Sequence, residues 1–440
     1  MNTTKNVVLW GWHFESDLDA VNTLASTSEI KICEWFGNHK QATVSLSQIA
    51  HDYHSILNLK QSITDLPMAD HDSDLRVFSG MYSRTTYGQG KSYFDLSHLY
   101  YLYLNYFSYL LKSKNVQQVW FANFPHFGPD YALYKAAKLA GIKTLLCFQS
   151  VITNRFFSVN SIEDFGLFEE TNLIEENGLN NPYKKEPPHY MKYVKNKLTS
   201  CRLSLVNDLR KKYLTSNKKP FTLEGVFYKY SECKQFKKHY KSLITKSVDN
   251  NTKFVYFPLQ LQPELTTSTM GKIFTDQILA IEKLRKILPD DWYIYIKENP
   301  KQTRRQRPAL FFQRLMKISN IKYLDNSHST FKLLDDCQFS ACVTGTSGWE
   351  AINQGKPVLV FGQPWYLRLP GVIEYSDTTT FEQIIKNQPR KDDVDSAFYE
   401  LMKKSHAGII DPYYKPSMSD YNRETNTKYI INFLRRVIND

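Results

Sequence analysis

The sequence lacks the patterns that mark several large classes of protein. Its six cysteines are scattered and include no CxxC pair, which argues against a zinc site and a disulfide framework. No run reaches the roughly 20 apolar residues of a membrane span. The first residues lack the apolar core and cleavage site of a signal peptide. The sequence therefore predicts a cytoplasmic protein with reduced thiols and no transmembrane helix.

Common catalytic and nucleic-acid motifs are missing as well. The chain has no GxSxG elbow, no HExxH pair, no Walker A loop and no cluster of ligand residues that indicates a metal. Zinc-finger spacing, RNA-recognition signatures and basic heptad helices are also lacking. We therefore expect no metal, no other cofactor and no nucleic-acid partner.

Positive charge and aromatic residues are abundant by contrast. The formal net charge is +12 at pH 7, and aromatic residues make up 14% of the chain. A basic protein suits an anionic small substrate or the anionic surface of a membrane. Aromatic residues line carbohydrate sites, but more often they fill hydrophobic cores.

Two blocks of the sequence alternate short apolar strands with helices, which predicts parallel sheets covered by helices. The first block is 1–153, with strands expected at 6–10, 29–36, 116–122 and 143–148 and helices at 16–26, 97–112 and 129–139. The second block is 251–415, with strands expected at 253–257, 292–296, 321–324, 339–343 and 357–361. The predicted fold class is α/β with two doubly wound domains, whose ligands bind at the carboxyl ends of the strands.

The segment 154–250 between the blocks is rich in Lys and less regular, and we interpret it as a helical insertion or linker. Its charge most simply forms a solvated face, and contact with a membrane surface or an acceptor is the alternative. A terminal amphipathic helix is expected within 416–440.

The strongest local pattern is Thr344-Gly345-Thr346-Ser347-Gly348, between an expected strand and an expected helix. Its glycines allow the backbone to turn and to approach a ligand. Free amides and the dipole at the start of a helix favour an anion such as phosphate. Glu350, about one turn further, can accept hydrogen bonds from ribose hydroxyls. A capping box, with Thr or Ser as N-cap and Glu three residues on, is the alternative and is compatible.

A second pattern follows the expected strand at 292–296. Lys297 stands at its carboxyl end and precedes Asn299 and Pro300. A lysine there faces the same crevice as the glycine loop and can neutralise a nucleotide phosphate. A plain turn with a surface lysine is the alternative.

A third pattern opens the second block, where prolines flank Gln260 and Gln262, and Glu264 follows. Stiff, polar backbone at a domain junction suits a sugar-binding cleft. Glu264 is a candidate nucleophile or electrostatic stabiliser of an oxocarbenium-like transition state. As an alternative, Glu264 only caps the next helix.

The first block supplies candidates for acid–base chemistry and for sugar binding. His126 and Asp130 lie between a strand and a helix, where Asp130 can instead complement the helix N-terminus. Arg155 can hold a sugar carboxylate through a bidentate contact. Glu163 is a third candidate acid–base residue.

Three stretches together resemble the capsule polysaccharide biosynthesis proteins of Gram-negative bacteria. These are FVYFPLQLQPELTTSTMG at 254–271, YIYIKENP at 293–300 and VTGTSGWEAINQGKPVLVFGQPWY at 343–366. The group includes KpsC- and KpsS-like proteins and related Kdo and nonulosonic-acid transferases. A weaker similarity covers 125–141. The resemblance is clear over roughly the second half of the chain.

The resemblance implies a GT-B fold, in which two Rossmann-like domains face a cleft. It implies a CMP-activated 2-keto-3-deoxy sugar acid as donor, either Kdo or a nonulosonic acid such as pseudaminic acid. Thr346 and Ser347 would then hold the CMP phosphate, and Glu350 the ribose. Lys297 and the Asn299-Pro300 pair would border the nucleotide. A covalent adduct on Glu264 would give retention of configuration.

The resemblance also implies an oligosaccharide or lipid-linked glycan as acceptor, at the inner face of the cytoplasmic membrane. The chain departs from its relatives in three places. Asn299 stands where relatives often have His, Gln260 lies near a position where they often have His, and Phe127 lies near a position where they often have an acidic residue. The last departure leaves the acid–base residue open among His126, Asp130 and Glu163.

Two other functions are compatible with these patterns. One is a nucleotide-sugar epimerase of the same fold, which would convert its substrate without an acceptor. The other is a non-catalytic sugar-binding or nucleotide-binding subunit of a capsule assembly complex, which would bind CMP without turning over a donor. Of the three functions, the combined motifs favour the transferase.

Overall fold

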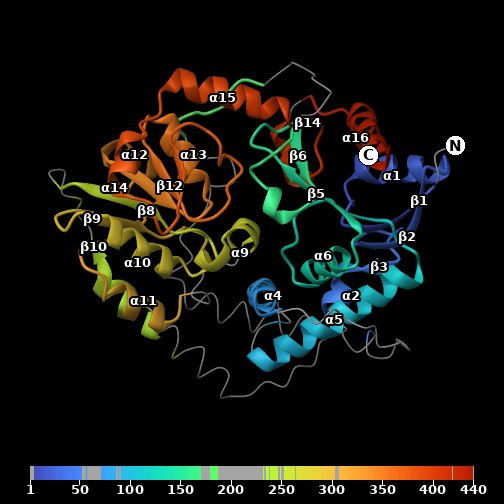
Figure 1. The fold of residues 1–440 in the computed structure, drawn as a ribbon, viewed down its shortest axis with the longest axis horizontal. Helices are drawn as coiled ribbons and strands as arrows, with labels where there is room; N and C mark the ends of the chain where they lie inside the picture. Colours follow the sequence, from blue (N-terminus) through green and yellow to red (C-terminus); the bar gives the residue numbers. More distant parts are fainter. Residues whose placement is uncertain are drawn as a thin grey trace. The chain divides into compact units, whose positions relative to one another are not determined.

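The computed structural model describes residues 4–51, 56, 71–85, 88, 91–169, 179–186, 231, 234–236, 238–245, 248, 252–262, 264–302, 307–418 and 420–439. The chain divides into two compact units (Figure 1). The first unit comprises residues 1–182, 263–270 and 395–440, and the second comprises 183–262 and 271–394. Among the described helices, none combines the length and apolar character needed to cross a membrane.

The first unit contains a seven-stranded sheet in the order β14-β6-β5-β4-β1-β2-β3. Its strands are β1 (Lys5–Trp10), β2 (Ile30–Gly37), β3 (Val44–Ser45), β4 (Gln118–Phe121), β5 (Lys143–Gln149), β6 (Arg155–Val159) and β14 (His406–Ala407). The five strands β1 to β5 are parallel, and β6 and β14 join in antiparallel fashion. Starting from the opposite edge, the first six strands are β3-β2-β1-β4-β5-β6. This order, 3-2-1-4-5-6, is that of a doubly wound nucleotide-binding fold.

Helices cover both faces of this sheet because its buried strands carry apolar side chains on both sides. Helices α1 (Glu15–Ser26) and α16 (Arg423–Asn439) pack on one face, where Val7 and Leu9 of β1 meet Phe433 of α16. Helices α5 (Tyr93–Ser113) and α6 (Pro129–Leu139) cover the other face, where Trp10 meets Phe107. Helices α2 (Leu46–His51) and α4 (Asp72–Arg84) complete this part of the unit.

The second unit contains a sheet of seven parallel strands in the order β13-β12-β11-β8-β9-β10-β7. The strands are β7 (Ile244–Thr245), β8 (Phe254–Pro258), β9 (Tyr293–Lys297), β10 (Ile321–Leu324), β11 (Phe339–Cys342), β12 (Val358–Val360) and β13 (Val372–Glu374). If β7 is left out and β8 is counted as the first strand, the order of these strands is again 3-2-1-4-5-6. The sequence prediction of two doubly wound domains is therefore confirmed.

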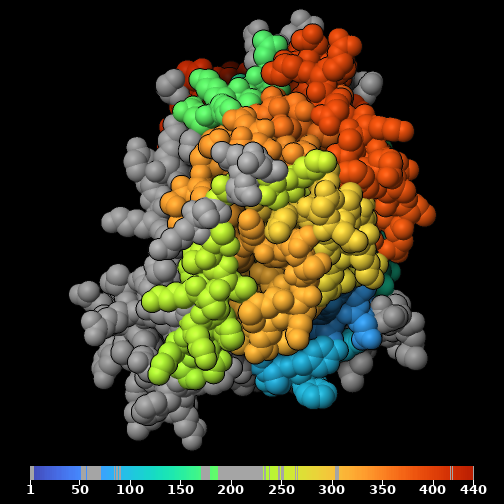
Figure 2. All heavy atoms as spheres, turned by 90° about the vertical axis from the view of Figure 1, so that its left-hand side faces the viewer, coloured from blue at the N-terminus to red at the C-terminus, as the bar shows by residue number. Residues whose placement is uncertain are grey.

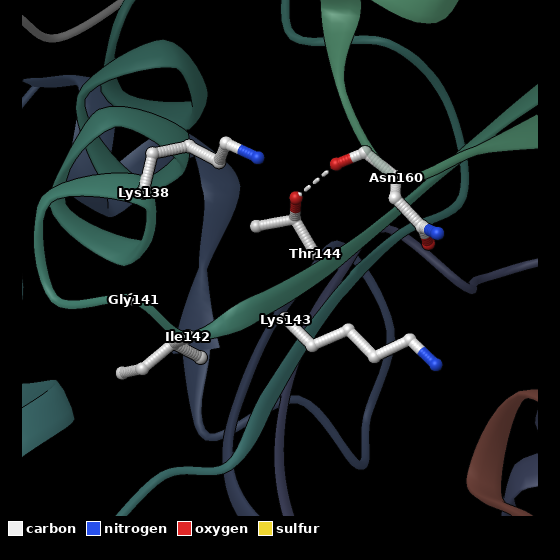
Figure 3. A pocket seen from close by; sticks show the side chains of 6 residues that line it. All are labelled: Lys138, Gly141, Ile142, Lys143, Thr144 and Asn160. Atoms are coloured by element: carbon white, nitrogen blue, oxygen red, sulfur yellow. Dashed lines mark hydrogen bonds between the residues drawn. The ribbon is translucent and has the colours of Figure 1, made fainter. Parts of the chain in front are cut away.

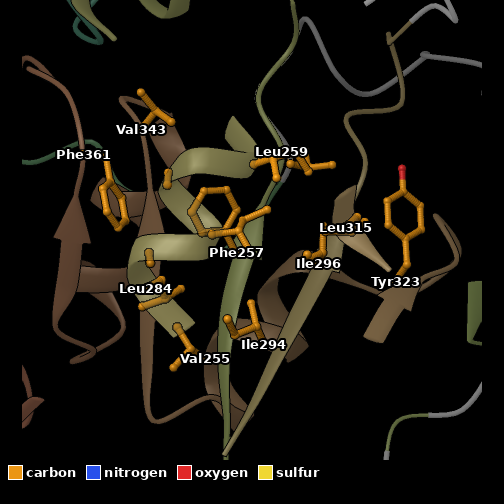
Figure 4. Close-up of a cluster of buried hydrophobic side chains, with 14 of the residues drawn as sticks. Val255, Phe257, Leu259, Leu284, Ile294, Ile296, Leu315, Tyr323, Val343 and Phe361 are labelled. Atoms are coloured by element: carbon orange, nitrogen blue, oxygen red, sulfur yellow. The ribbon is translucent and has the colours of Figure 1, made fainter. Parts of the chain in front are cut away.

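The second unit includes helices α10 (Gln277–Ile287), α11 (Ala309–Leu315), α12 (Thr330–Asp336), α13 (Thr346–Asn353) and α14 (Phe381–Lys386). On one face of the sheet, Val255 and Ile294 pack with Leu284 of α10 in the cluster that Figure 4 shows. On the other face, Tyr256 packs with helices α12 and α13. Figure 2 shows the yellow and orange side chains of this unit close together on one face of the molecule.

The chain returns to the first unit twice. Helix α9 (Leu265–Met270) contacts α4 and η1 (Ile162–Asp164) of that unit, and η3 (Lys272–Thr275) follows in the second unit. Helix α15 (Lys391–Lys403) then leads to η5 (Pro412–Ser417) and α16, which belong to the first unit. The predicted terminal helix is thus confirmed, and it packs mainly on α1.

Two local expectations need correction. Helix α1 begins at Glu15, one residue before the expected start at 16, and the Ser16 hydroxyl accepts a hydrogen bond from Asn426. The interpretation of 154–250 as helical is wrong at its start, because residues 155–159 form strand β6, which pairs with β5 on one side and with β14 on the other. Residues 170–178, 187–230, 232–233, 237, 246–247 and 249–250 of that segment lie outside the described residues.

Candidate functional site

The loops after β8 and β11 meet at the point where the strand order of the second sheet reverses. At such a point the two loops lead to helices on opposite faces of the sheet, which leaves a crevice between the loops. Ligands of doubly wound sheets bind in this crevice. The Gln260 side chain joins the two loops. Its Oε1 accepts a hydrogen bond from the Thr344 amide at 2.7 Å, and its Nε2 donates to the Thr344 hydroxyl at 2.9 Å. Both residues are buried, so these two hydrogen bonds, which we call the clamp, fix the two loops relative to each other.

Helix α13 begins at this clamp with Gly345 as its N-cap, and no side chain caps it. The Gly348 amide donates to the Gly345 carbonyl at 3.0 Å. Within the described part of the chain, no hydrogen bond from the amides of Thr346 and Ser347, the first two residues of the helix, is found. An uncapped helix start is suited to an anion, because its amides and the helix dipole both attract negative charge. The alternative capping box is not formed.

Gly348 is required by the packing around the start of α13. A Cβ atom on Gly348 would lie 2.2 Å from the Tyr366 hydroxyl, and Tyr366 is fully buried. That hydroxyl donates to the Gly345 carbonyl. The loop after β12 therefore fixes the helix start through Tyr366, a residue that the sequence analysis did not single out.

Lys297 and Glu350 are oppositely charged side chains at the same edge of the sheet. Lys297 Nζ donates to the His328 carbonyl at 2.7 Å and to the Thr330 hydroxyl at 2.9 Å. Burial lowers the pKa of Lys297 to about 8, and the charges of Glu350 and Asp325 oppose this shift. Burial raises the pKa of Glu350 to about 7, and the charge of Lys297 opposes it. Both groups therefore titrate near neutral pH.

A buried ion pair supports the loop that carries Gln260 and Gln262. Arg307 Nε donates to Glu298 Oε2 at 2.8 Å, and neither side chain is exposed. Arg307 also donates to Gln262 Oε1 at 2.6 Å and to the Gln260 carbonyl at 3.2 Å. The Tyr323 hydroxyl donates to Glu298 as well. The structure thus gives Gln260 and Gln262 contacts within the protein, and their binding of sugar stays a prediction.

Asn299 and Pro300 continue this edge of the second sheet. The Asn299 amide donates to Glu298 Oε1, and Asn299 Oδ1 accepts from the Lys301 amide, both at 2.9 Å. Asn299 therefore stabilises the turn after β9 in the manner of an Asx-turn. Pro300 is partly exposed beside it. Their contact with a nucleotide stays a prediction.

In the first unit, the loop after β4 carries His126 and Asp130. Asp130 is buried, and its carboxylate accepts hydrogen bonds from the amides of His126, Phe127, Gly128 and Tyr131. This arrangement closes the start of α6. His126 Nδ1 lies 2.7 Å from the Phe124 carbonyl, which favours a proton on Nδ1 and leaves a lone pair on Nε2. Of these two candidates, His126 has the geometry of a base.

Glu163 and Arg155 both belong to the first unit as well. Glu163 accepts hydrogen bonds from the hydroxyls of Ser161 and Tyr134. Burial alone would raise its pKa, but these bonds, its own backbone amide and the charge of Lys135 lower it overall, which keeps the group ionised. Arg155 is only 2% exposed. Its proposed contact with a sugar carboxylate therefore requires its side chain to become accessible.

Glu264 stands directly before α9 and is partly exposed. Its carbonyl accepts the Ser268 amide at 2.8 Å, which closes the first turn of the helix. The hydroxyl of Thr269 donates to the Pro125 carbonyl at 2.8 Å and so holds α9 against the His126 loop. All catalytic candidates therefore belong to the first unit, whereas the nucleotide candidates belong to the second.

One surface pocket lies away from these residues. Figure 3 shows it at the amino end of β5, lined by Lys138, Gly141, Ile142, Lys143, Thr144 and Asn160. The Thr144 hydroxyl donates to the Asn160 carbonyl across it. It contains none of the predicted site residues and lies at the edge of the first sheet opposite to the carboxyl ends of its parallel strands.

One comparison with known proteins, that with a family profile, agrees with the motifs. The sequence profile described as "Capsule polysaccharide biosynthesis protein" matches residues 180–411. A similar solved structure is KpsC of Thermosulfurimonas dismutans, a β-Kdo 2,7 transferase, with 12% identity over 74% of this chain and 87% of that chain at a TM-score of 0.33. Another is UDP-GlcNAc 2-epimerase of Neisseria meningitidis, with 14% identity over 98% and 100% and a TM-score of 0.23. No curated protein sequence matches.

Proposed function

The chain belongs to the capsule polysaccharide biosynthesis proteins; from this premise we propose that it is a glycosyltransferase of capsule assembly whose donor is a CMP-activated 2-keto-3-deoxy sugar acid. The sugar is Kdo or a nonulosonic acid such as pseudaminic acid, and it is transferred with retention to a growing surface glycan. The observation that carries the proposal is the uncapped start of α13 beside Lys297 and Glu350.

The second unit offers a place for each part of the nucleotide. The amides of Thr346 and Ser347 suit the phosphate, and the ammonium of Lys297 adds positive charge. The carboxylate of Glu350 suits the ribose hydroxyls. A CMP-linked sugar acid carries two negative charges, one on its phosphate and one on its carboxylate. A chain with a net charge of +12 attracts such a donor over a distance.

In the proposed mechanism, Glu264 attacks the anomeric carbon and displaces CMP, and the acceptor hydroxyl then displaces Glu264. Two displacements at one carbon retain its configuration. The partly exposed position of Glu264 at the start of α9 is compatible with an attack on a bound donor. The acceptor is an oligosaccharide or a lipid-linked glycan, and positive charge would hold the enzyme near an anionic leaflet.

The affinity for CMP should peak between about pH 7 and pH 8. Below about pH 7 the Glu350 carboxylate takes up a proton and no longer accepts hydrogen bonds well from the ribose. Above about pH 8 the Lys297 ammonium loses its proton and no longer attracts the phosphate. Because a hydrogen bond to a charged group contributes about 1.5–3 kcal/mol, each limb should change the affinity roughly tenfold. Calorimetric titration at several pH values measures this.

Two variants show which residue causes each part of this pH dependence. In Glu350→Gln, the affinity for CMP should no longer fall below about pH 7, apart from the effect of protonating the nucleotide phosphate itself near pH 6. Lys297→Met should flatten the alkaline limb and lower affinity throughout. An affinity that stays constant from pH 6 to pH 9 in the wild type would remove both residues from the nucleotide site.

A further inference from the structure

The loop after β1 has an unusual backbone. Gly11 and Trp12 both have positive φ angles, 82° and 52°, and Trp12 is fully buried. A positive φ is strained for a bulky residue, and such strain is often found at functional sites. Two indoles hold the loop: Trp12 Nε1 donates to the Trp120 carbonyl and Trp35 Nε1 to the Gly11 carbonyl, both at 3.0 Å. The turn leaves the next residue, His13, exposed.

His13 lies where the strand order of the first sheet reverses, between β1 and β4. The same sheet edge carries a cavity of about 480 Å³ after β2, lined by Gly37, Asn38, His39, Lys40, Ala42 and Ser45. The Trp35 amide donates to the Thr43 hydroxyl at 2.8 Å, and the Thr43 amide donates back to the Trp35 carbonyl at 3.0 Å. The loop that lines the cavity is therefore fixed at both ends.

His39 has a defined place in this cavity. Its ring packs edge-on against Trp35 with 4.5 Å between centroids. A Cβ atom on Gly37 would lie 2.5 Å from His39 Nε2, so only glycine leaves room for the ring. Neither ring nitrogen of His39 finds a hydrogen-bond partner among the described residues, although both are shielded from water. A ligand can supply the missing partners.

His13 and His39 act on each other electrostatically. Partial burial lowers the pKa of each ring, and a positive charge on His13 would lower the pKa of His39 further. The Asp411 carboxylate acts on His13 in the opposite direction and would stabilise its protonated form. A neutral imidazole with a carboxylate nearby is suited to take up a proton during a reaction.

We propose that this cavity binds the glycan acceptor and that His13 takes the proton from the acceptor's attacking hydroxyl. The proposal rests on the transferase function. None of the six lining residues is a carboxylate, and their amide, hydroxyl, imidazole and ammonium groups match the hydroxyls and acidic groups of a glycan. The acceptor O–H bond breaks and its proton passes to a ring nitrogen of His13. The acceptor oxygen bonds to the anomeric carbon as the bond to the Glu264 carboxylate breaks, and the imidazolium releases its proton to solvent.

Separate assays of the two half-reactions test this role. With a CMP-Kdo or CMP-pseudaminic acid donor, His13→Asn should retain the wild-type rate of the first CMP release, in which the sugar passes to Glu264, but lose glycan transfer by about 100-fold or more. His98→Asn, a change of an exposed histidine on α5, is the control and should leave both rates unchanged. The proposal is overturned if His13→Asn transfers normally, or if it loses CMP release as well. A selective loss of transfer in His126→Asn but not in His13→Asn would assign the base to His126 instead.

A binding measurement keeps the proposal testable without a donor. NMR signals of ¹³C-labelled imidazoles can be followed during titration with methyl glycosides of Kdo, glucuronic acid, galactose and N-acetylglucosamine. We expect at least one glycoside to shift the signals of both His13 and His39, and Gly37→Ala to abolish the shift by displacing the His39 ring. If no glycoside shifts either signal, the cavity is not an acceptor site. A shift in a protein that turns over no CMP-sugar would contradict only the proposed function.

Discussion

Glu264→Gln should lower glycan transfer by roughly 10⁴-fold while the affinity for CMP changes less than about twofold. The neutral amide cannot form the covalent bond to the anomeric carbon, and it cannot stabilise positive charge there. The residues proposed to hold the nucleotide, Lys297 and Glu350 among them, belong to the second unit, whereas Glu264 belongs to the first. Transfer kinetics and calorimetric titration with CMP separate the two effects.

Glu400→Gln is the matched control for this variant. Glu400 is an exposed residue of α15 in the first unit, and its carboxylate pairs only at the surface with Lys403. The same change of charge at Glu400 should leave transfer unaffected. Near-normal transfer by Glu264→Gln would remove Glu264 from the mechanism and, with it, the proposed covalent adduct.

Arg307→Met should destabilise the second unit by about 3–5 kcal/mol, because it leaves the Glu298 carboxylate buried without its cation. It should also weaken CMP binding, since Arg307 holds the loop of Gln260 and Gln262 in place. Urea unfolding measures the first effect and calorimetric titration the second. The double variant Glu298→Gln with Arg307→Met should be more stable than Arg307→Met alone, because no buried charge remains.

A surface pair provides the comparison for Arg307. Arg423 makes two contacts of 2.6 Å with Asp19, but both side chains are largely exposed. Arg423→Met should therefore cost far less stability than Arg307→Met. Equal destabilisation by the two changes would show that burial of the Glu298–Arg307 pair does not govern its contribution.

The sequence was a good guide to the fold wherever apolar residues alternate with helical segments. Strands β8, β9 and β11 and helix α6 match their predicted positions within one or two residues. The order of the strands follows from the preference for right-handed crossovers between parallel strands. Strand β6 was missed because it is a short antiparallel strand, next to a Lys-rich segment that has no regular period.

The site was only partly predictable. The start of α13 and the position of Lys297 could be read from the sequence because glycine, hydroxyl and basic residues directly follow strands there. The buried pair of Glu298 and Arg307 could not be predicted from the sequence. Neighbouring residues at the end of β9 point to opposite sides of the sheet, and the partner of Glu298 lies nine residues further along the chain. His13 and His39 also follow strands, but the strained turn and the room left by Gly37 are visible only in three dimensions.

The most direct test of the central claim is a thermal-shift panel of the purified protein with CMP, CDP, UDP, GDP and ADP. A ligand that binds only the folded state stabilises it by about 2.7 kcal/mol at 100 times its dissociation constant, so the shift reports selectivity. We expect CMP to raise the melting temperature well above the other nucleotides. A larger shift with UDP or GDP would contradict the proposed donor and the roles assigned to Glu264 and Arg155.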